Sequence, residues 1–347
     1  LLKAGDGFVQ ALDTFLQNKK EACMVVLCSS SVSFVENHMV TKMGRLAHKL
    51  TGFLKLRELQ LWDVAAYFPD YSWEDCVNVY SILGGLPGLW QAFDASVSVR
   101  ENICNVILAQ GGRLHEEGAH IVSGQLRECG VYFSILGALA QGKNKLNELY
   151  QHTGFSRAKI SVYLKNLMEL ELVEKVFSLD TPGRDNQRKA VYRISHPLVR
   201  FWFCFLYADS SLLLRMSPEA YYEQLVKPAL TLYCESCFSK VCQEYMQREA
   251  AVHALPVEIT DFGSFVGKAG SIDYIGHDGN GQYIVAFADY KDPVFPYEKY
   301  LQAKALTGQA GIRPDYMYLF SGHGFDAKLE ALDKELDTLI LIRMDDL

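Results

Sequence analysis

The sequence lacks the features that mark several common classes of protein. Its 34 Lys and Arg residues are outnumbered by 41 Asp and Glu residues, which gives a net charge of −7. No global positive field attracts nucleic acid, so any DNA contact must come from a local patch. No apolar run is long enough to cross a bilayer, and no signal-peptide pattern opens the chain. We therefore expect a cytoplasmic protein without a membrane partner.

Disulfide, zinc and phosphate-loop patterns are also missing. The nine cysteines are scattered through predicted helices and strands, which favours a reducing compartment. Cys234 and Cys237 have metal-ligand spacing, but no second pair follows, so we interpret them as packed thiols. The pattern Gly-x-x-x-x-Gly-Lys-Ser/Thr occurs nowhere, and residues 263–268 only approximate it. The chain begins with Leu1, not methionine, and we interpret it as a fragment.

What the sequence does contain is clearest between residues 131 and 194. An apolar helix pattern covers 131–140, a short helix follows at 146–150, and Ser156 is a suitable N-cap for a third helix. Apolar side chains recur in that third helix at helical spacing, at Ile160, Leu164, Leu167 and Met168. Three helices in this order are typical of a helix-turn-helix module.

A hairpin completes this module. Residues 170–176 and 190–194 read as two strands, and the polar residues 182–186 between them read as a turn. The segment is therefore predicted to be a winged helix-turn-helix. Its candidate DNA contacts are the cations of the third helix and of the wing, namely Arg157, Lys159, Lys165, Arg184, Arg188 and Lys189.

The N-terminal part has the pattern of a nucleotide-binding sheet. After a helix at 8–16, the fully apolar residues 23–28 predict a strand that is covered on both faces, and 50–56 predict another. Ser29 and Ser30 follow the first strand at its carboxyl end, where open α/β sheets place their ligands. Arg45 could face a phosphate there, or it could be an ordinary solvated arginine.

Helices are expected through the middle of the chain, and an aromatic-rich run at 196–207 predicts a packing spine between domains. The predicted helices cover 59–68, 73–81, 102–109, 120–128 and 225–247. Residues 84–88 contain three glycines and a proline, which predicts a sharp corner between helices.

The C-terminal part predicts a small α/β module. Strands are expected at 258–262, 271–276, 282–291, 316–320 and 339–342, helices at 297–307 and 326–332, and a loop at 263–270. Because side chains alternate along a strand, Asp289 and Lys291 should share a face, and Asp273 could lie beside them. Two carboxylates would hold Mg²⁺ and the lysine would activate water, which is the arrangement of a metal-dependent nuclease. Solvated charge pairs at strand ends are the plainer alternative.

Several stretches together resemble the archaeal-type AAA-like ATPases. They include residues 26–36 (VLCSSSVSFVE), 66–72 (AYFPDYS), 80–87 (YSILGGLP), 200–203 (RFWF) and 318–325 (YLFSGHGF). The resemblance implies a multidomain α+β protein, mostly helical, whose parent binds ATP. Its implied parts are a remnant of the nucleotide-binding domain (1–58), a helical lid (59–128), the winged helix (129–195), packing helices (196–224) and a restriction-endonuclease-like domain (225–347).

Two departures from that family matter. The lysine and acids with which the family binds and hydrolyses ATP are absent, so we expect that this chain does not hydrolyse ATP on its own. Ser29 also stands where the family usually has glycine. The family also ends the strand after its Ile-Asp pair with acid-x-lysine-aromatic. A gapless register puts Phe287 at the acid and Asp289 at the lysine, whereas a shift of two residues restores the pattern with Asp289 and Lys291.

Three functions stay open on the sequence alone. The first is a DNA-associated part of an ATPase, with the basic residues of the winged helix on phosphates. The second is a Mg²⁺-dependent nuclease that uses Asp273, Asp289 and Lys291. The third is a protein-interaction module in which the winged helix docks a protein partner.

Overall fold

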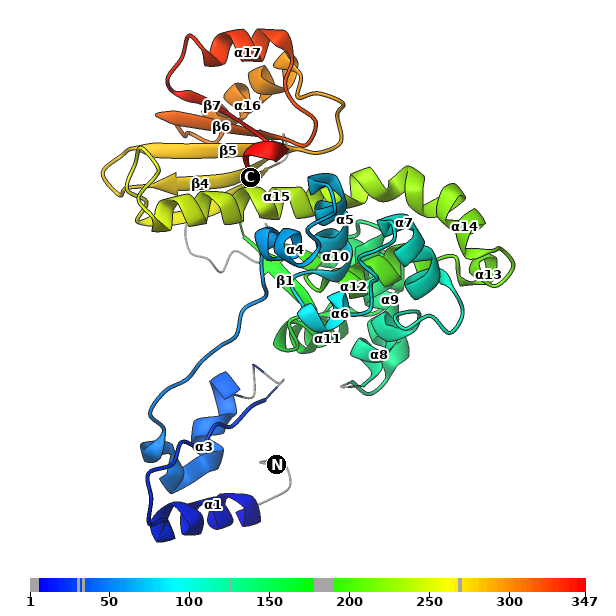
Figure 1. Cartoon of the computed structure of the whole chain (residues 1–347), viewed down its shortest axis with the longest axis vertical. Coiled ribbons are helices and arrows are strands. Elements are labelled where there is room, and N and C mark those ends of the chain that lie inside the picture. Colours follow the sequence, from blue (N-terminus) through cyan, green and yellow to red (C-terminus); the bar gives the residue numbers. More distant parts are fainter. Residues whose placement is uncertain (1–5, 30–31, 33–34, 125, 178–189, 268–269) are drawn as a thin grey trace.

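The computed structural model describes residues 6–29, 32, 35–124, 126–177, 190–267 and 270–347 and has a mixed α+β fold (Figure 1). Helices dominate the first two thirds of the chain, and a five-stranded sheet forms the C-terminal part. In the described ranges, no helix is both long enough and apolar enough to cross a membrane.

The first residues form a small helical unit, which we call the N-terminal unit. It contains α1 (Asp6–Asn18), η2 (Val35–Met39), α3 (Val40–Met43) and η3 (Gly44–Lys49). Met39, Met43 and Leu46 are buried there against apolar side chains of α1. Residues 50–60, which we call the linker, then run without helix or strand to the rest of the molecule (Figure 1).

A helical region follows the linker. Its elements are α4 (Leu61–Tyr67), α5 (Trp73–Leu83), α6 (Pro87–Trp90), α7 (Val99–Asn102), η4 (Ile103–Leu108) and α8 (Glu117–Ser123). Ser72 caps α5 as its sequence predicts, because its side chain accepts a hydrogen bond from the Asp75 amide. The helix predicted at 120–128 is α8, which ends earlier, at Ser123.

The winged helix-turn-helix forms next and agrees with its sequence pattern. It contains α9 (Cys129–Ala140), α10 (Leu146–Thr153), α11 (Arg157–Glu169), and the antiparallel strands β1 (Val173–Val176) and β2 (Val191–Ile194). The turn predicted at 182–186 lies outside the described residues. Ile160, Leu164 and Leu167 are fully buried, and Met168 is partly buried against the same cluster.

Further helices connect the winged helix to the C-terminal sheet. They are α12 (Pro197–Phe201), η5 (Trp202–Tyr207), α13 (Ser210–Leu213), α14 (Pro218–Tyr221), η6 (Tyr222–Val226) and the long α15 (Lys227–Ala251). The aromatic run at 196–207 packs against both large apolar clusters, with Phe201 and Phe205 in one and Phe203 in the other. Trp202 packs beside both large apolar clusters, and its indole donates a hydrogen bond to the His115 carbonyl at 2.9 Å.

The C-terminal sheet has the strand order β3-β4-β5-β6-β7. Its elements are β3 (Asp261–Gly267), β4 (Gly270–His277), β5 (Tyr283–Asp289), α16 (Tyr297–Gln309), β6 (Tyr316–Ser321), α17 (Ala327–Asp333), β7 (Leu339–Arg343) and η7 (Met344–Asp346). The first three strands are antiparallel, and β5, β6 and β7 are parallel. Helix α15 covers one face of the sheet, while α16 and α17 cover the other (Figure 1).

One apolar cluster crosses the domain boundary that the sequence suggested at 224. It joins α5 of the helical region, α15, and the inner side chains Tyr274, Ala286 and Phe320 of the sheet. A second cluster fills the winged helix and includes Val122, Val199 and Phe203 from the flanking helices, and a third lies beneath α16 and α17. The helical region and one face of the sheet therefore share a core.

Two predicted strands are wrong. Residues 23–28 and 50–56 form neither helix nor strand, and most of their apolar side chains face solvent, with Met24 89% and Leu54 86% exposed. A fully apolar run indicates a buried strand only when neighbouring strands are there to pair with it. Within the described residues, neither run has such a neighbour.

The loop predicted at 263–270 is also wrong, because β3 continues to Gly267 and pairs with β4. The glycines at 263 and 267 suggested a loop, but cross-strand pairing overrides that local preference. The pairing contains a bulge, in which Asp273 and Tyr274 of β4 lie opposite the single residue Ser264 of β3.

Candidate functional sites

The first candidate site is the exposed face of α11. The helix begins at Ser156, whose hydroxyl accepts from the Lys159 amide at 3.2 Å. Its apolar stripe is buried against α9, α10 and the strands, which fixes the opposite face toward solvent. Ala158, Ser161, Val162 and Lys165 are all exposed on that face, at helical spacing.

The three predicted cations of α11 all lie at its surface, in different settings. The Arg157 guanidinium donates to the Asn147 side chain and lies 4.3 Å from the centre of the Tyr150 ring. The Lys159 ammonium lies 4.8 Å from the ring of Phe155. Lys165 pairs with Glu169 at 3.8 Å, but both side chains are largely exposed, so this pair is weak and easily exchanged.

The wing supplies one further cation that sequence reasoning missed. Arg184, Arg188 and Lys189 lie outside the described residues, so their placement stays a prediction. Lys175 on β1 is paired in register with Tyr192 on β2, and its ammonium lies 5.7 Å from the centre of that ring. The signal for Lys175 was its place in the first predicted strand of the wing.

The second candidate site is a cavity of about 350 Å³ in the C-terminal part, between α15, α16, β4 and β5. Its polar lining comes from Glu235, Ser239, Ser271, Asp273, Lys291, Lys299 and Gln302, and Phe287 and Phe295 belong to its apolar wall. The cavity combines charges of both signs with a partly apolar wall, which is typical of ligand sites.

Asp273 enters this cavity from the bulge in β4. Its carboxylate accepts a hydrogen bond from the Ala288 amide at 2.8 Å. Burial raises the pKa of Asp273 to about 6, although hydrogen bonds from Ala288 and Ser239 act in the opposite direction. Asp273 is therefore protonated in a large fraction of molecules near pH 6.

Asp289 is buried at the end of β5 and is held by other groups. One carboxylate oxygen accepts from the amides of Lys291 and Asp292, and the other accepts from the Lys299 ammonium at 2.5 Å. Burial opposes ionisation, but the bonds from Lys299 and Asp292 hold the pKa of Asp289 below its usual value. Asp289 is thus ionised and paired, and it is not among the side chains that line the cavity.

Lys291 lies beyond the end of β5, so strand alternation does not place it on one face with Asp289. Its ammonium pairs with Glu235 of α15 at 3.7 Å and lines the cavity together with Asp273. Among the described residues, no group of three or more His, Cys, Asp or Glu side chains is arranged to hold a metal ion.

Sequence reasoning missed two charged residues of this cavity, Glu235 and Lys299. Both lie on helices far along the chain from Asp273, and only the packing of α15 and α16 on the sheet brings them there. Phe287, the residue at the acid position in the gapless register, lies in the cavity wall.

The residues predicted to sense a nucleotide are only partly described. Ser29 follows the exposed apolar run, and Ser30 lies outside the described residues. Arg45 is exposed on η3. Its charge helps to lower the pKa of Asp13, for which the hydrogen bond from Lys49 is the main cause.

Comparison with known proteins gives two family matches. Residues 134–175 match the arsR family of bacterial regulatory proteins, and residues 202–295 match DUF234, described as archaeal and bacterial proteins of unknown function. An uncharacterized protein of Methanocaldococcus jannaschii is 24% identical over 300 residues, which cover 82% of this chain and 64% of that relative. The chain therefore spans less than two thirds of that relative's length. No solved structure matches the chain. The chain thus contains a helix-turn-helix segment similar to that of arsR-family regulators within a mixed α+β fold, and a segment similar to a family of unknown function.

Proposed function

We propose that this chain is the DNA-binding part of an AAA-like ATPase, with α11 in the major groove and the wing on the phosphate backbone. The observation that carries the proposal is the exposed face of α11, where small side chains lie between Arg157, Lys159 and Lys165. Small residues let a helix approach base edges closely, and flanking cations neutralise phosphates. The match to the arsR regulators supports the same role.

The ATPase part of the proposal rests on the resemblance of the sequence to that family. In the parent protein, the ATP site would be separate from the winged helix that contacts DNA. The winged helix would then couple nucleotide state to DNA, because it lies between the N-terminal unit and the C-terminal sheet in the chain. Ser29, Ser30 and Arg45 would be the nearest of these residues to the nucleotide.

The test is the salt dependence of binding to duplex DNA, measured by fluorescence anisotropy. We expect the logarithm of the binding constant to fall linearly with the logarithm of salt concentration. The slope of this line should be about −0.9 for each phosphate contact. Lys159→Ala and Lys165→Ala should each reduce that slope by about 1 and weaken binding to every sequence alike.

Lys227→Ala is the matched control, because Lys227 is also an exposed helical lysine but begins α15, outside the winged helix. It should leave both the affinity and the slope unchanged. A binding constant that does not depend on salt, or equal effects of all three variants, would contradict the proposal. Co-purification with a protein and no retention of DNA would favour the docking role instead.

A second candidate function is metal-dependent hydrolysis of nucleic acid in the C-terminal cavity. The observation that favours it is the meeting of Asp273, Glu235 and two lysines in one cavity. Mg²⁺ would bind the carboxylates of Asp273 and Glu235, and Lys291 would orient water. Against it stand the pairing of Asp289 with Lys299 and the place of Phe287 in the cavity wall.

This candidate is tested by incubating the protein with single- and double-stranded DNA and RNA in Mg²⁺ or Mn²⁺. Cleavage that disappears in Asp273→Asn but persists in the control variant Asp278→Asn would support it. Asp278 is a half-buried turn residue of the β4–β5 hairpin, whose carboxylate accepts from the amides of Asn280, Gly281 and Gln282, and it does not line the cavity. If no substrate is cleaved with either metal, the cavity is not a nuclease site.

A further inference from the structure

The N-terminal unit contacts the winged helix through a bridge of three charges. The ammonium of Lys55, on the linker, lies 2.8 Å from a carboxylate oxygen of Glu171 and 3.3 Å from one of Glu36. Glu36 belongs to η2, and Glu171 follows the C-terminal end of α11. The bond to Glu171 is the main cause of a raised pKa for Lys55, so its ammonium stays charged.

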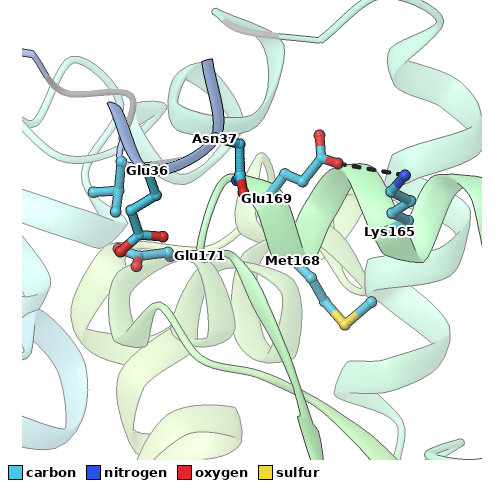
Figure 2. A pocket seen from close by; sticks show the side chains of 7 residues that line it. Glu36, Asn37, Lys165, Met168, Glu169 and Glu171 are labelled. Atoms are coloured by element: carbon cyan, nitrogen blue, oxygen red, sulfur yellow. Dashed lines mark ion pairs between the residues drawn. The ribbon is translucent and has the colours of Figure 1, made fainter. Parts of the chain in front are cut away.

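A cavity of about 260 Å³ lies at the same contact. Its lining includes Glu36 and Asn37 from the N-terminal unit and Lys165, Glu169 and Glu171 from the winged helix. Figure 2 shows Glu36 beside Glu171 and Asn37 beside Glu169, with Lys165 paired to Glu169 along the helix. Lys165, a cation predicted to bind DNA, therefore lines the same cavity as residues of the N-terminal unit.

The docked unit occupies the surface that a DNA backbone would need in order to reach Lys165. Glu36 and Asn37 of the N-terminal unit line the same cavity as Lys165. Docking brings the ammonium of Lys55 together with the carboxylate of Glu36, so the charges that it adds nearly cancel. The occupied space beside Lys165 therefore makes DNA binding there less favourable.

The N-terminal unit is also built to move. Its buried side chains, Met39, Met43 and Leu46, pack against its own α1. The linker that joins it to α4 has no helix or strand, and most of its side chains are exposed. The contact with α11 is made by exposed ion pairs, which are individually weak and easily broken.

We propose that the N-terminal unit is an autoinhibitory element, which docks on the C-terminal end of α11 through Lys55 and is displaced when duplex DNA binds. DNA and the docked unit exclude each other at Lys165. This inference rests on the proposed DNA-binding function of the winged helix, and the experiments below separate the failure of one from the failure of the other.

The first experiment uses carbodiimide cross-linking, which joins an ammonium to a carboxylate that already contacts it. In the free protein, mass spectrometry of the digest should show a Lys55–Glu171 cross-link. It should also show a Lys49–Asp13 cross-link, because that pair lies 2.9 Å apart entirely within the N-terminal unit. Saturating duplex DNA should remove the first cross-link and leave the second unchanged.

The outcomes separate failure of the DNA-binding function from failure of the autoinhibitory proposal. If the protein does not bind DNA, the proposed function fails, whereas the cross-link in the free protein still reports the docked state. If DNA binds and the Lys55–Glu171 cross-link persists at its original yield, the autoinhibitory proposal is overturned. Absence of that cross-link in the free protein, beside a normal Lys49–Asp13 product, overturns it as well.

The second experiment compares two lysine variants of equal charge by anisotropy with the same duplex. Lys55→Met breaks the bridge to α11 and should raise DNA affinity about two- to five-fold, the range expected from losing exposed ion pairs. Lys49→Met removes the same charge but only the bridge within the unit, and it should not raise affinity. Loss of a cation ordinarily weakens DNA binding, so a gain in Lys55→Met alone has no simple charge explanation. Equal effects of the two variants would refute the proposal.

Discussion

At the scale of single residues, burial and pairing decide which acids are free to act. Asp273 and Asp289 both lie near the end of β5, yet burial raises the pKa of one and ion pairing lowers that of the other. Both carboxylate oxygens of Asp289 already accept hydrogen bonds, one from Lys299 and the other from two backbone amides. It therefore acts as a structural anchor for the turn after β5, and Asp273 is the acid that faces the cavity.

The pairing of Asp289 predicts a difference between two lysines. Lys299→Ala leaves a buried carboxylate without its counter-charge and should lower the free energy of unfolding by about 3 kcal/mol. Lys291→Ala removes only a half-exposed pair with Glu235 and should cost less than about 1 kcal/mol. Urea denaturation at pH 7 measures both, and equal costs would show that Asp289 is not anchored by Lys299.

The raised pKa of Asp273 predicts a pH dependence of stability. The folded state binds this proton more tightly than the unfolded state does, so Asp273 favours folding when protonated. That contribution is lost as the pH rises from the ordinary aspartate pKa of 3.8 to the raised pKa of about 6. Asp273→Asn should remove this loss and be more stable than the wild type at pH 7, by about 2 kcal/mol. Parallel stability curves of the two proteins between pH 4 and pH 7 would contradict the assignment.

At the scale of elements, local sequence signals predicted helices well, because a helix makes its backbone hydrogen bonds within itself. The same signals failed at segments whose structure depends on pairing with a neighbouring strand. The helix of the winged module follows from Ser156 and an apolar stripe, both of which lie within thirteen helical residues and their cap. The runs at 23–28 and 50–56 have strand-like composition, but a strand exists only through its pairing. In the same way, β3 forms across two glycines because β4 pairs with it.

The glycine-rich corner between α5 and α6 gives a prediction at this scale. A Cβ at Gly85 would lie 1.8 Å from the Leu59 carbonyl oxygen, which is far inside contact distance. Gly85→Ala must therefore push the end of the linker away from this corner, and we expect a loss of about 3 kcal/mol or more in unfolding free energy. Gly88→Ala, for which a Cβ meets nothing within 4 Å, should be neutral or stabilising. Thermal unfolding of the two variants is the measurement, and similar melting temperatures would contradict the close approach at Gly85.

At the scale of the whole molecule, α15 joins the helical region to the sheet, while the N-terminal unit stands apart. A single apolar cluster runs from α4 and α5 through α15 to β4, β5 and β6. Cooperative unfolding is expected for elements that share one core, and independent opening for those that do not.

Hydrogen exchange should display this division. Amides of α5, α15 and β5 should exchange together, at the rate of global unfolding, because they share that cluster. Amides of the linker and of residues 23–29 should exchange many-fold faster, since these segments form no helix or strand. Slow exchange in the linker, comparable with that of α15, would argue against a separate N-terminal unit.

The sequence by itself determined the winged helix, the long helix α15 and most of the α/β module. These follow from periodicity, caps and turns, which are short-range properties of the chain. It also predicted Asp273 as a candidate site residue, and Asp273 lines the C-terminal cavity. Only the tertiary structure decided that Lys299 neutralises Asp289, that Glu235 joins Asp273 in one cavity, and that Lys55 ties the linker to α11. Each of these pairs joins residues that lie in different elements, and no local pattern of the chain encodes which elements will meet.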